Sequence, residues 1–335
     1  MRVSRFVFTL ALCLAIVGVV TAASSAHAEK RLPALRVQAR IPIGNLPGGL
    51  VGAAGSLWAI TSFPKEEVVQ IDPATNRVVA RLVLPTHTSP GPSDVNWITY
   101  AAGNLWVSRM QDDEVDRVSI DPLALVARVK ITDPFDVAVA GASAFVPQFD
   151  PYSWAVIDSS SNTVVKTAPA TGPTSAVFDD GAIWLLEHRA QELLRIDPGT
   201  NSVTKRIPIK TVGGGPERIA AGFGSIWATD PQGSVARIDE KTGKQLVEVV
   251  FPPGPTFNPY TIATGGGSVW VGTDHGVSRI NPATNRITAA LRLAFDNHVC
   301  GPAVQFLCVN GVTYASGSVW LSYWRTREII RVSPR

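Results

Sequence analysis

The chain has few charged residues and few long apolar runs. Only 17% of its 335 residues are charged, while 45% are hydrophobic, and 28 Gly and 25 Pro are spread along the sequence. A disordered polyelectrolyte would carry more charge, and a bundle of membrane helices would contain repeated long apolar segments. Both classes are therefore excluded, and we expect a globular protein with an ample core.

The sequence also lacks an excess of basic residues. Thirty Lys and Arg stand against 27 Asp and Glu, which gives a formal net charge of +3. Arg2 and Arg5 belong to the N-terminal segment, so residues 29–335 hold 28 basic and 27 acidic residues. Proteins that bind the phosphate backbone need a marked basic surplus. Nucleic acid is therefore not an expected partner.

The N-terminus is basic and then apolar. Two arginines precede an apolar run over residues 6–20, and small residues ending in Ala28 follow it. This order is typical of a secretory signal peptide, and the run is shorter than the roughly 18 residues that a spanning helix requires. We predict a signal peptide over residues 1–28, cleaved before Glu29, and a single secreted or periplasmic domain over residues 29–335. An uncleaved anchor is the alternative; after cleavage no membrane attachment is expected.

Cysteine is scarce, with three residues in the whole chain. Cys13 lies within the predicted signal peptide, which leaves Cys300 and Cys308. Two cysteines in an exported chain suggest one disulfide, and closing so short a loop would contribute roughly 2.5 kcal/mol. Two buried thiols are the alternative. A metal site formed by this pair with His298 is a poor prediction, because the three residues lack a C-x-x-C spacing.

One short phrase, Gly, any residue, an aliphatic residue and Trp, recurs along the chain. It reads GSLW at 55–58, GNLW at 103–106, GAIW at 181–184, GSIW at 224–227, GSVW at 267–270 and GSVW at 317–320, with a degenerate copy, ASAF, at 142–145. The seven copies define an aromatic column: Trp58, Trp106, Phe145, Trp184, Trp227, Trp270 and Trp320. We interpret this column as packing residues within a repeated unit.

A second phrase, Ile-Asp-Pro or a close variant, follows each aromatic residue, as in DPATN at 72–76 and NPATN at 281–285. Asp or Asn before Pro favours a turn, and β-branched runs such as RVVARLVL at 77–84 follow in most copies. Helical periodicity is absent over any long window, whereas apolar alternation recurs. Each repeat is therefore predicted to form four short antiparallel strands. Seven repeats of about 40 residues predict an all-β, seven-bladed β-propeller.

The last repeat is too short to supply its own outer strand. Residues 36–43, RVQARIPI, match the outer-strand pattern and come before the first repeat. We predict that this N-terminal strand completes the last blade, which would remove an open sheet edge.

The Gly-x-[Leu/Ile/Val]-Trp phrase followed by Ile-Asp-Pro-Ala-Thr-Asn resembles the YVTN-repeat propellers and the related streptogramin B (virginiamycin B) lyases, over about residues 36–335. The resemblance implies a seven-bladed propeller. The lyases are enzymes that open a cyclic lactone by elimination, with a metal, carboxylates and histidine on the face of the ring, whereas the YVTN-type relatives are mostly binding proteins. A binding or scaffold protein and a lyase-like or lactonase-like enzyme therefore both stay open.

In a four-stranded meander, the start of the inner strand and the loop between strands two and three lie at the same end. Three columns of residues are therefore expected near the mouth of the central channel. Nine residues before each aromatic stand Gly49, Trp97, Asp136, Ser175, Arg218, Thr261 and Gly311; ten before stand Gly48, Asn96, Phe135, Thr174, Glu217, Tyr260 and Asn310; three after stand Thr61, Arg109, Gln148, Glu187, Asp230, Thr273 and Tyr323.

These columns predict a mouth for a small polar or anionic ligand, or for a partner protein or peptide. The predicted ligand-binding residues are Arg109 and Arg218 as charged contacts, Asn96 and Asn310 as hydrogen-bonding groups, Trp97 and Tyr260 as stacking surfaces, and Asp136 beside them. A solvated rim in which the arginines pair with neighbouring carboxylates is the alternative. We expect the protein to be a monomer.

Glu187 stands where a lyase-like Trp-Phe-Thr-Glu phrase has its glutamate. The catalytic candidates of an enzyme would be Glu187, His188 and His275, and its metal ligands Glu187 and Asp230, holding Mg²⁺ or Ca²⁺. Neither histidine falls in the two channel columns, and a solvated loop histidine is the alternative. No cofactor is established by the sequence.

The acidic run Asp112, Asp113, Glu114 and Asp116 lacks the glycine-punctuated alternation of a calcium loop. We predict a solvated hairpin loop there. The sequence contains no Gly-x-Ser-x-Gly elbow, P-loop or His-Glu-x-x-His motif.

Overall fold

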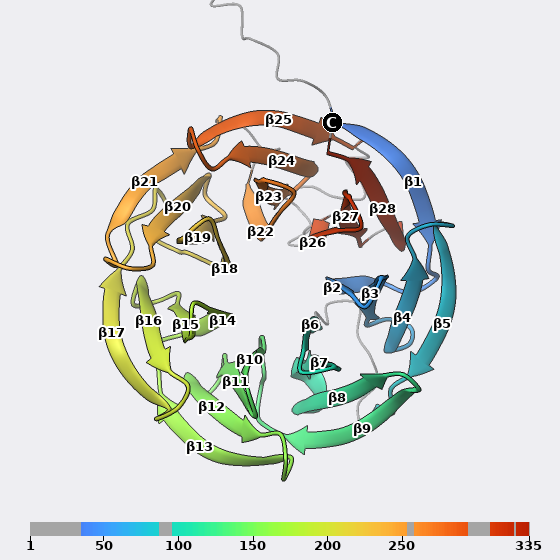
Figure 1. Cartoon of the computed structure of the whole chain (residues 1–335), viewed down its shortest axis with the longest axis horizontal. Coiled ribbons are helices and arrows are strands. Elements are labelled where there is room, and N and C mark those ends of the chain that lie inside the picture. The colour runs from blue at the N-terminus through green and yellow to red at the C-terminus, as the bar shows by residue number, and fades with distance from the viewer. Residues whose placement is uncertain (1–34, 87–95, 253–257, 294–308, 325, 335) are drawn as a thin grey trace, which may run out of the picture. The chain divides into compact units, whose positions relative to one another are not determined.

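The computed structural model describes residues 35–86, 96–252, 258–293, 309–324 and 326–334. These residues form seven sheets of four antiparallel strands within one unit of the chain, Leu32–Arg335 (Figure 1). The only helical segment among them is one 3-10 turn, Met110–Asp112. In the described ranges no helix has the length and apolar character to cross a membrane. The predicted seven-bladed β-propeller is confirmed.

The blades are numbered along the chain, and each contributes an inner, a second, a third and an outer strand. The inner strands are β2 (Pro47–Ala53), β6 (Trp97–Ala101), β10 (Ala138–Ala140), β14 (Pro173–Asp179), β18 (Arg218–Gly222), β22 (Pro259–Gly265) and β26 (Val309–Ala315). The second strands are β3 (Ser56–Thr61), β7 (Asn104–Arg109), β11 (Ser143–Gln148), β15 (Ala182–Glu187), β19 (Ser225–Asp230), β23 (Ser268–Thr273) and β27 (Ser318–Tyr323). The third strands are β4 (Glu67–Asp72), β8 (Glu114–Ile120), β12 (Ser153–Asp158), β16 (Glu192–Asp197), β20 (Ser234–Asp239), β24 (Gly276–Asn281) and β28 (Glu328–Ser333). The outer strands are β5 (Arg77–Val83), β9 (Leu123–Lys130), β13 (Thr163–Pro169), β17 (Ser202–Pro208), β21 (Gln245–Val250), β25 (Arg286–Arg292) and, in blade 7, β1 (Arg36–Pro42).

The inner strands of neighbouring blades contact one another all the way round, so the seven sheets close into a ring. In Figure 1 the blue strand β1 lies against the red strand β28. The two strands pair antiparallel from Arg36 opposite Ser333 to Pro42 opposite Glu328. The predicted closure of the last blade by the N-terminal strand is therefore confirmed.

The Gly-x-x-Trp phrase forms a tight turn between the inner and second strands. In blade 1 the two central residues, Ala54 and Gly55, have φ of 48° and 75°. Positive φ at both positions defines a type I′ hairpin turn, which favours glycine. The indole Nε1 of Trp58 donates a hydrogen bond to the Ala53 carbonyl at 3.2 Å, just before the turn. Glycine and tryptophan thus recur together because they build one hairpin.

The Asp-Pro phrase forms the turn between the third and outer strands. Asp72 accepts hydrogen bonds from the Ala74 N–H at 2.8 Å and from the Thr75 hydroxyl at 2.7 Å. Asn76 follows in the left-handed region with φ of 56°, which asparagine tolerates better than most residues. The predicted turn chemistry is confirmed.

The apolar core consists of seven clusters, each shared by two neighbouring blades. Every cluster contains one residue of the aromatic column, and all seven column residues are at most 1% exposed. Trp58, for example, packs with Ile98 and Val107 of the next blade. The column therefore joins adjacent blades, as a packing role requires.

Arginines add a second, polar connection between blades at four junctions. Each lies on a third strand and donates to a turn carbonyl of the next blade: Arg117 to Ser159 (2.6 Å), Arg237 to Pro282 (2.6 Å), Arg279 to Pro334 (3.1 Å) and Arg331 to Pro73 (2.6 Å). Three of them, Arg117, Arg237 and Arg331, also lie over the column tryptophan of their own blade. We call these four residues the arginine latches.

Candidate functional site

Arg218 is the first residue of β18 in blade 5, and its guanidinium reaches aromatic rings of two other blades. Its Cζ lies 3.5 Å from the ring centroid of Trp97 and 4.5 Å from that of Phe135. Trp97 begins β6 of blade 2, and blades 3 and 4 separate it from blade 5 in the ring. The Arg218 side chain therefore crosses the central channel at its mouth.

The polar partners of Arg218 come from the intervening blades. Its Nη1 donates to the Thr174 carbonyl at 3.2 Å and lies 3.7 Å from Oδ2 of Asp136. The same Oδ2 accepts hydrogen bonds from the Ser175 hydroxyl at 3.0 Å and from the Ala176 N–H at 3.2 Å. Arg218 is only 7% exposed, so its charge sits in an environment that contains little water.

The charge of Arg218 is poorly compensated. Burial lowers the pKa of Arg218 to about 10, and the carboxylates of Asp136 and Glu217 offset this only in part. A guanidinium offers five N–H donors, yet among the described residues only Nη1 has hydrogen-bond or ion-pair partners. Nearby, Nε1 of Trp97 and the Thr174 hydroxyl are buried and meet no partner in the described ranges. Donors without a partner among the described residues thus surround a positive charge at the mouth.

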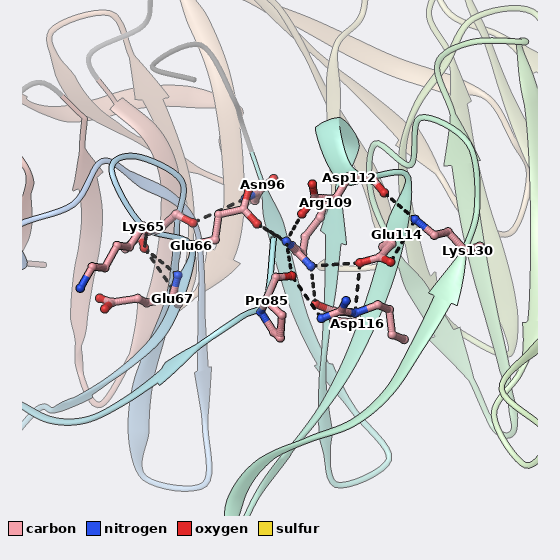
Figure 2. Close-up of polar contacts among 12 residues, drawn as sticks. Lys65, Glu66, Glu67, Pro85, Asn96, Arg109, Asp112, Glu114, Asp116 and Lys130 are labelled. Atoms are coloured by element: carbon pink, nitrogen blue, oxygen red, sulfur yellow. Dashed lines mark hydrogen bonds and ion pairs between the residues drawn. The ribbon is translucent and has the colours of Figure 1, made fainter. Parts of the chain in front are cut away.

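Arg109 has different surroundings. It ends β7, is 0% exposed, and contacts carboxylates from blades 1 and 2 (Figure 2). Its Nε donates to Glu66 at 2.6 Å, its Nη1 to Glu114 at 3.1 Å and Asp116 at 3.0 Å, and its Nη2 to Asp112 and to the Pro85 carbonyl at 3.0 Å. All five donors are therefore used, and none is left for a ligand in the channel.

Two further cations offset part of the negative charge around Arg109. Arg128 lies 3.1 Å from Glu114 and 3.5 Å from Asp116, and the Lys130 ammonium lies 3.2 Å from Glu114. Burial raises the pKa of Asp116 although Arg109 lowers it. Burial alone would lower the pKa of Arg109, but the surrounding carboxylates outweigh it and raise that pKa.

The prediction of a solvated acidic loop is wrong for three of its four residues. Asp112, Glu114 and Asp116 are at most 4% exposed because they form ion pairs with the buried Arg109. Asp113 is exposed. Asn96 belongs to the same cluster: it is 1% exposed and donates to Glu66 at 3.1 Å.

Glu187 and Asp230 each bind the loop that precedes the inner strand of their own blade. Glu187 accepts from the Thr171 N–H and from Arg206, both at 3.1 Å. Asp230 accepts from the N–H groups of Gly213 at 2.9 Å and Gly215 at 3.4 Å. Both carboxylates are 0% exposed. Each carboxylate thus has hydrogen-bond donors within its own blade, and the role of the two residues as metal ligands stays a prediction.

The described part of the chain contains no other candidate set of metal ligands. There, no three His, Cys, Asp or Glu side chains are grouped so that they could hold a metal ion. Cys300 and Cys308 lie outside the described residues, so the predicted disulfide stays a prediction.

The two candidate histidines lie in loops between second and third strands. His188 Nδ1 lies 3.0 Å from both the Pro216 carbonyl and Oε2 of Glu217. This carboxylate raises the pKa of His188 above its ordinary value. His275 is 6% exposed. Their catalytic roles stay predictions.

The remaining predicted residues lie on blades 6 and 7. Tyr260 is half-buried, and burial together with Asp274 and Glu217 raises the pKa of Tyr260 to about 12. Burial also raises the pKa of Asp274 to about 6, even though Asn258 donates to it at 2.8 Å. Asn310 is 7% exposed on the inner strand β26.

The structure thus brings together Arg218, Trp97 and Asp136, whereas the side chains of Arg109 and Asn96 both bind Glu66. Sequence reasoning placed Phe135 and Thr174 in a channel column without naming them as ligand residues. It missed Glu66 altogether. No sequence signal marks Glu66, because its partner Arg109 is 43 residues away in another blade.

No protein-family model matches the chain, and a search of curated proteins finds no match. Solved structures do resemble it. The WD40 repeats of RRP9 align with a TM-score of 0.70 at 12% identity, covering 91% of this chain and 99% of that one. A structure of U3-55K aligns with a TM-score of 0.69 at 11% identity, over 90% and 98% of the two chains. The WD40 domain of Neurospora crassa Pan2 aligns at 0.64 and 12% identity, over 87% and 90%. At this identity the likeness establishes the propeller fold alone.

Proposed function

We propose that this protein is a binding or scaffold propeller that takes a carboxylate group at the mouth of its channel, on Arg218. The carboxylate would belong to a small acid or to an acidic residue of a partner peptide. The fold shared with WD40 propellers is compatible with such a role. The observation that carries the proposal is the state of Arg218, which is buried, poorly compensated and short of hydrogen-bond partners.

A carboxylate suits this site for a physical reason. A buried charge is costly unless it is paired and hydrogen-bonded. A carboxylate could accept two parallel N–H bonds from the guanidinium and leave the aromatic contacts in place. Asp136 cannot fill that role, because its Oδ2 lies 3.7 Å from Nη1 and is already bonded to Ser175 and Ala176.

The test is calorimetric titration of succinate, its neutral diamide, a Glu-Glu-Glu peptide and a Gln-Gln-Gln peptide. The acids should bind and their neutral counterparts should not. Arg218→Gln should weaken binding roughly tenfold to a hundredfold, the range of a charge-assisted hydrogen bond. Whether succinate or the peptide binds more tightly separates the two sources of the carboxylate.

Arg189→Gln is the matched control. Arg189 also stacks on an aromatic ring, 4.4 Å from the centroid of Tyr152, but lies outside the channel columns. The Arg189→Gln variant should bind the acids like the wild type. Equal losses in both variants, or no preference of the wild type for acids, would refute the proposal.

An enzyme resembling the streptogramin lyases is the second candidate. His188 favours it, because a histidine oriented by a carboxylate is suited to proton transfer and Glu217 lies 3.0 Å from its Nδ1. Such an enzyme would open a lactone or ester in the presence of Mg²⁺ or Ca²⁺, and would lose turnover with chelator and in His188→Gln. Lactone turnover that survives both changes would remove this candidate. Membership of the YVTN-repeat and lyase-like group is part of the same proposal and rests on the repeated phrase.

We also propose that the chain is exported and loses residues 1–28, because its N-terminus has the order of a signal peptide. Mass spectrometry of the secreted or periplasmic product should then find Glu29 at its N-terminus. A disulfide between Cys300 and Cys308 would make the product two hydrogens lighter than the dithiol form. Two alkylatable thiols in the unreduced protein would contradict the disulfide.

A further inference from the structure

The turn between the third and outer strands differs in blade 5. After the Ile-Asp phrase, five blades place proline and blade 3 places serine, whereas blade 5 places Glu240. Glu240 is 8% exposed, and its Oε1 is buried and accepts no hydrogen bond from any described residue. A buried carboxylate oxygen without a donor is costly, so this departure from the repeat needs a physical explanation.

The junction between blades 4 and 5 also lacks an arginine latch. Arg195 occupies the corresponding position in blade 4, but its Nη1 donates to Thr204 of its own blade at 3.5 Å. At two other junctions an asparagine of the turn, Asn76 or Asn285, accepts a second hydrogen bond from the latch. Gly243 stands at this position in blade 5 and has no side chain to accept one. Lys205 bridges the junction instead, by donating to the Thr242 carbonyl at 2.5 Å.

A pocket of about 340 Å³ lies at this junction. It is lined by Asp179 and Asp180 from the first turn of blade 4, and by Gly224, Glu240 and Lys241 from blade 5. Burial raises the pKa of Glu240 to about 7, together with the charge of Asp179 and a side-chain hydrogen bond with it, and Asp180 and Asp239 act in the same direction. Lys241 is the one basic residue that lines the pocket, against the three carboxylates of Asp179, Asp180 and Glu240.

The pocket lies at the opposite end of the ring from Arg218. In an antiparallel meander, the turns that follow the inner and third strands share one end, and the channel mouth is at the other. The pocket is therefore independent of the carboxylate site proposed above.

We propose that this pocket binds the guanidinium of an arginine on a partner protein, at a junction where the chain supplies no arginine of its own. A guanidinium in the pocket can donate to the carboxylates of Glu240 and Asp179 together, because its N–H groups are planar and paired. The four latches show that guanidinium groups fit the equivalent region of other junctions. A bound metal is less suited, since the described carboxylates form no three-residue metal group.

The test is titration of the full-length protein at pH 8 with N-acetylarginine amide, which models an arginine within a chain, and with its neutral citrulline analogue. The arginine amide should bind at one site at least ten times more tightly than the citrulline amide. Glu240→Gln should weaken that binding at least tenfold. Lowering the pH to 5.5 should weaken it too, because Glu240 then becomes protonated.

Three controls make the result decisive. Glu192→Gln removes the same charge at the opposite end of blade 4 and should bind like the wild type. Arg218→Gln should bind normally as well, so failure of the carboxylate site leaves this test intact. Thermal unfolding should show that Glu240→Gln is at least as stable as the wild type at pH 8, because a buried charge has been removed.

Equal binding of the arginine and citrulline amides would overturn the proposal, as would equal losses in Glu240→Gln and Glu192→Gln. Titration with Ca²⁺ provides the last arm. Calcium binding that depends on Glu240, without binding of the arginine amide, would assign the pocket to a metal and refute the guanidinium site.

Discussion

Arg109 and Arg218 show how neighbours decide what an arginine does. Both are almost fully buried. Arg109 uses all five N–H donors, four carboxylates surround it, and its pKa is raised. Arg218 uses one nitrogen, faces two aromatic rings, and its pKa is lowered. The first joins two blades, whereas the second keeps N–H donors that have no partner among the described residues.

Replacing Arg109 by Met should destabilise the protein strongly. The change leaves Glu66, Glu114 and neighbouring buried carboxylates without their central counter-charge, and breaking a buried ion pair costs about 3–5 kcal/mol. Urea unfolding at pH 7 measures this loss. Arg40→Met removes a partly exposed pair with Glu328 and should cost no more than about 1 kcal/mol. A loss that small at Arg109 would contradict our account of the cluster.

Two column tryptophans allow the indole hydrogen bond to be measured. Trp227 Nε1 donates to the Gly222 carbonyl at 3.1 Å, whereas Trp106 Nε1 has no partner among the described residues. Trp→Phe removes similar volume at both sites, so Trp227→Phe should cost about 1 kcal/mol more. Denaturant midpoints of the two variants give the difference. Equal losses would mean that the column needs tryptophan for its size alone.

The strands and their turns could be predicted almost completely from the repeated phrases. Gly55 and Asn76 indicate turns with positive φ, and Trp58 binds the carbonyl just before the first of these turns. These features are local, and they recur in most blades, so one sequence displays them repeatedly. The acidic run 112–116 could not be predicted in the same way. Its burial depends on Arg109 and on a loop from another blade, which no periodicity reveals.

Strand β1 allows a test at the level of one element. A variant lacking residues 29–43 loses the pairing with β28 and the buried side chains of Ile41 and Ile43. Losing two such side chains costs about 4 kcal/mol or more, so the whole ring should melt at a lower temperature. Circular dichroism follows this transition. A variant lacking only residues 29–34 keeps β1 and should melt like the wild type; identical melting of both deletions would contradict closure by β1.

Across the whole molecule, the arginine latches distribute the connection between blades unevenly. Arg331 donates to Pro73 at 2.6 Å and to Asn76 at 3.0 Å across the closure of the ring, whereas Arg195 remains within its own blade. Both stack on a column tryptophan. Arg331→Met should therefore destabilise the protein by about 1–2 kcal/mol more than Arg195→Met. Chemical denaturation compares them, and equal effects would show that the latches contribute only through stacking.

The candidate site could be predicted in part at this scale. Arg218, Trp97 and Asp136 were found because inner-strand starts converge on the channel in any propeller. The interactions between distant blades could not be predicted. A column tells at which end of the ring a residue lies, but it does not tell in which direction the side chain points. Glu240 was overlooked, although its place in a proline column is visible in the sequence.

Closure by β1 also sets an order of events during synthesis. Arg40 of β1 and Glu328 of β28, which pair across the closure, stand 288 positions apart. During synthesis, and again during the export proposed above, β1 and the first six blades emerge before β28 does. The first strand to appear must therefore wait with an unpaired edge while the rest of the ring assembles beside it. The nascent protein should depend on chaperones most during that interval, and should lose the dependence as soon as β28 emerges.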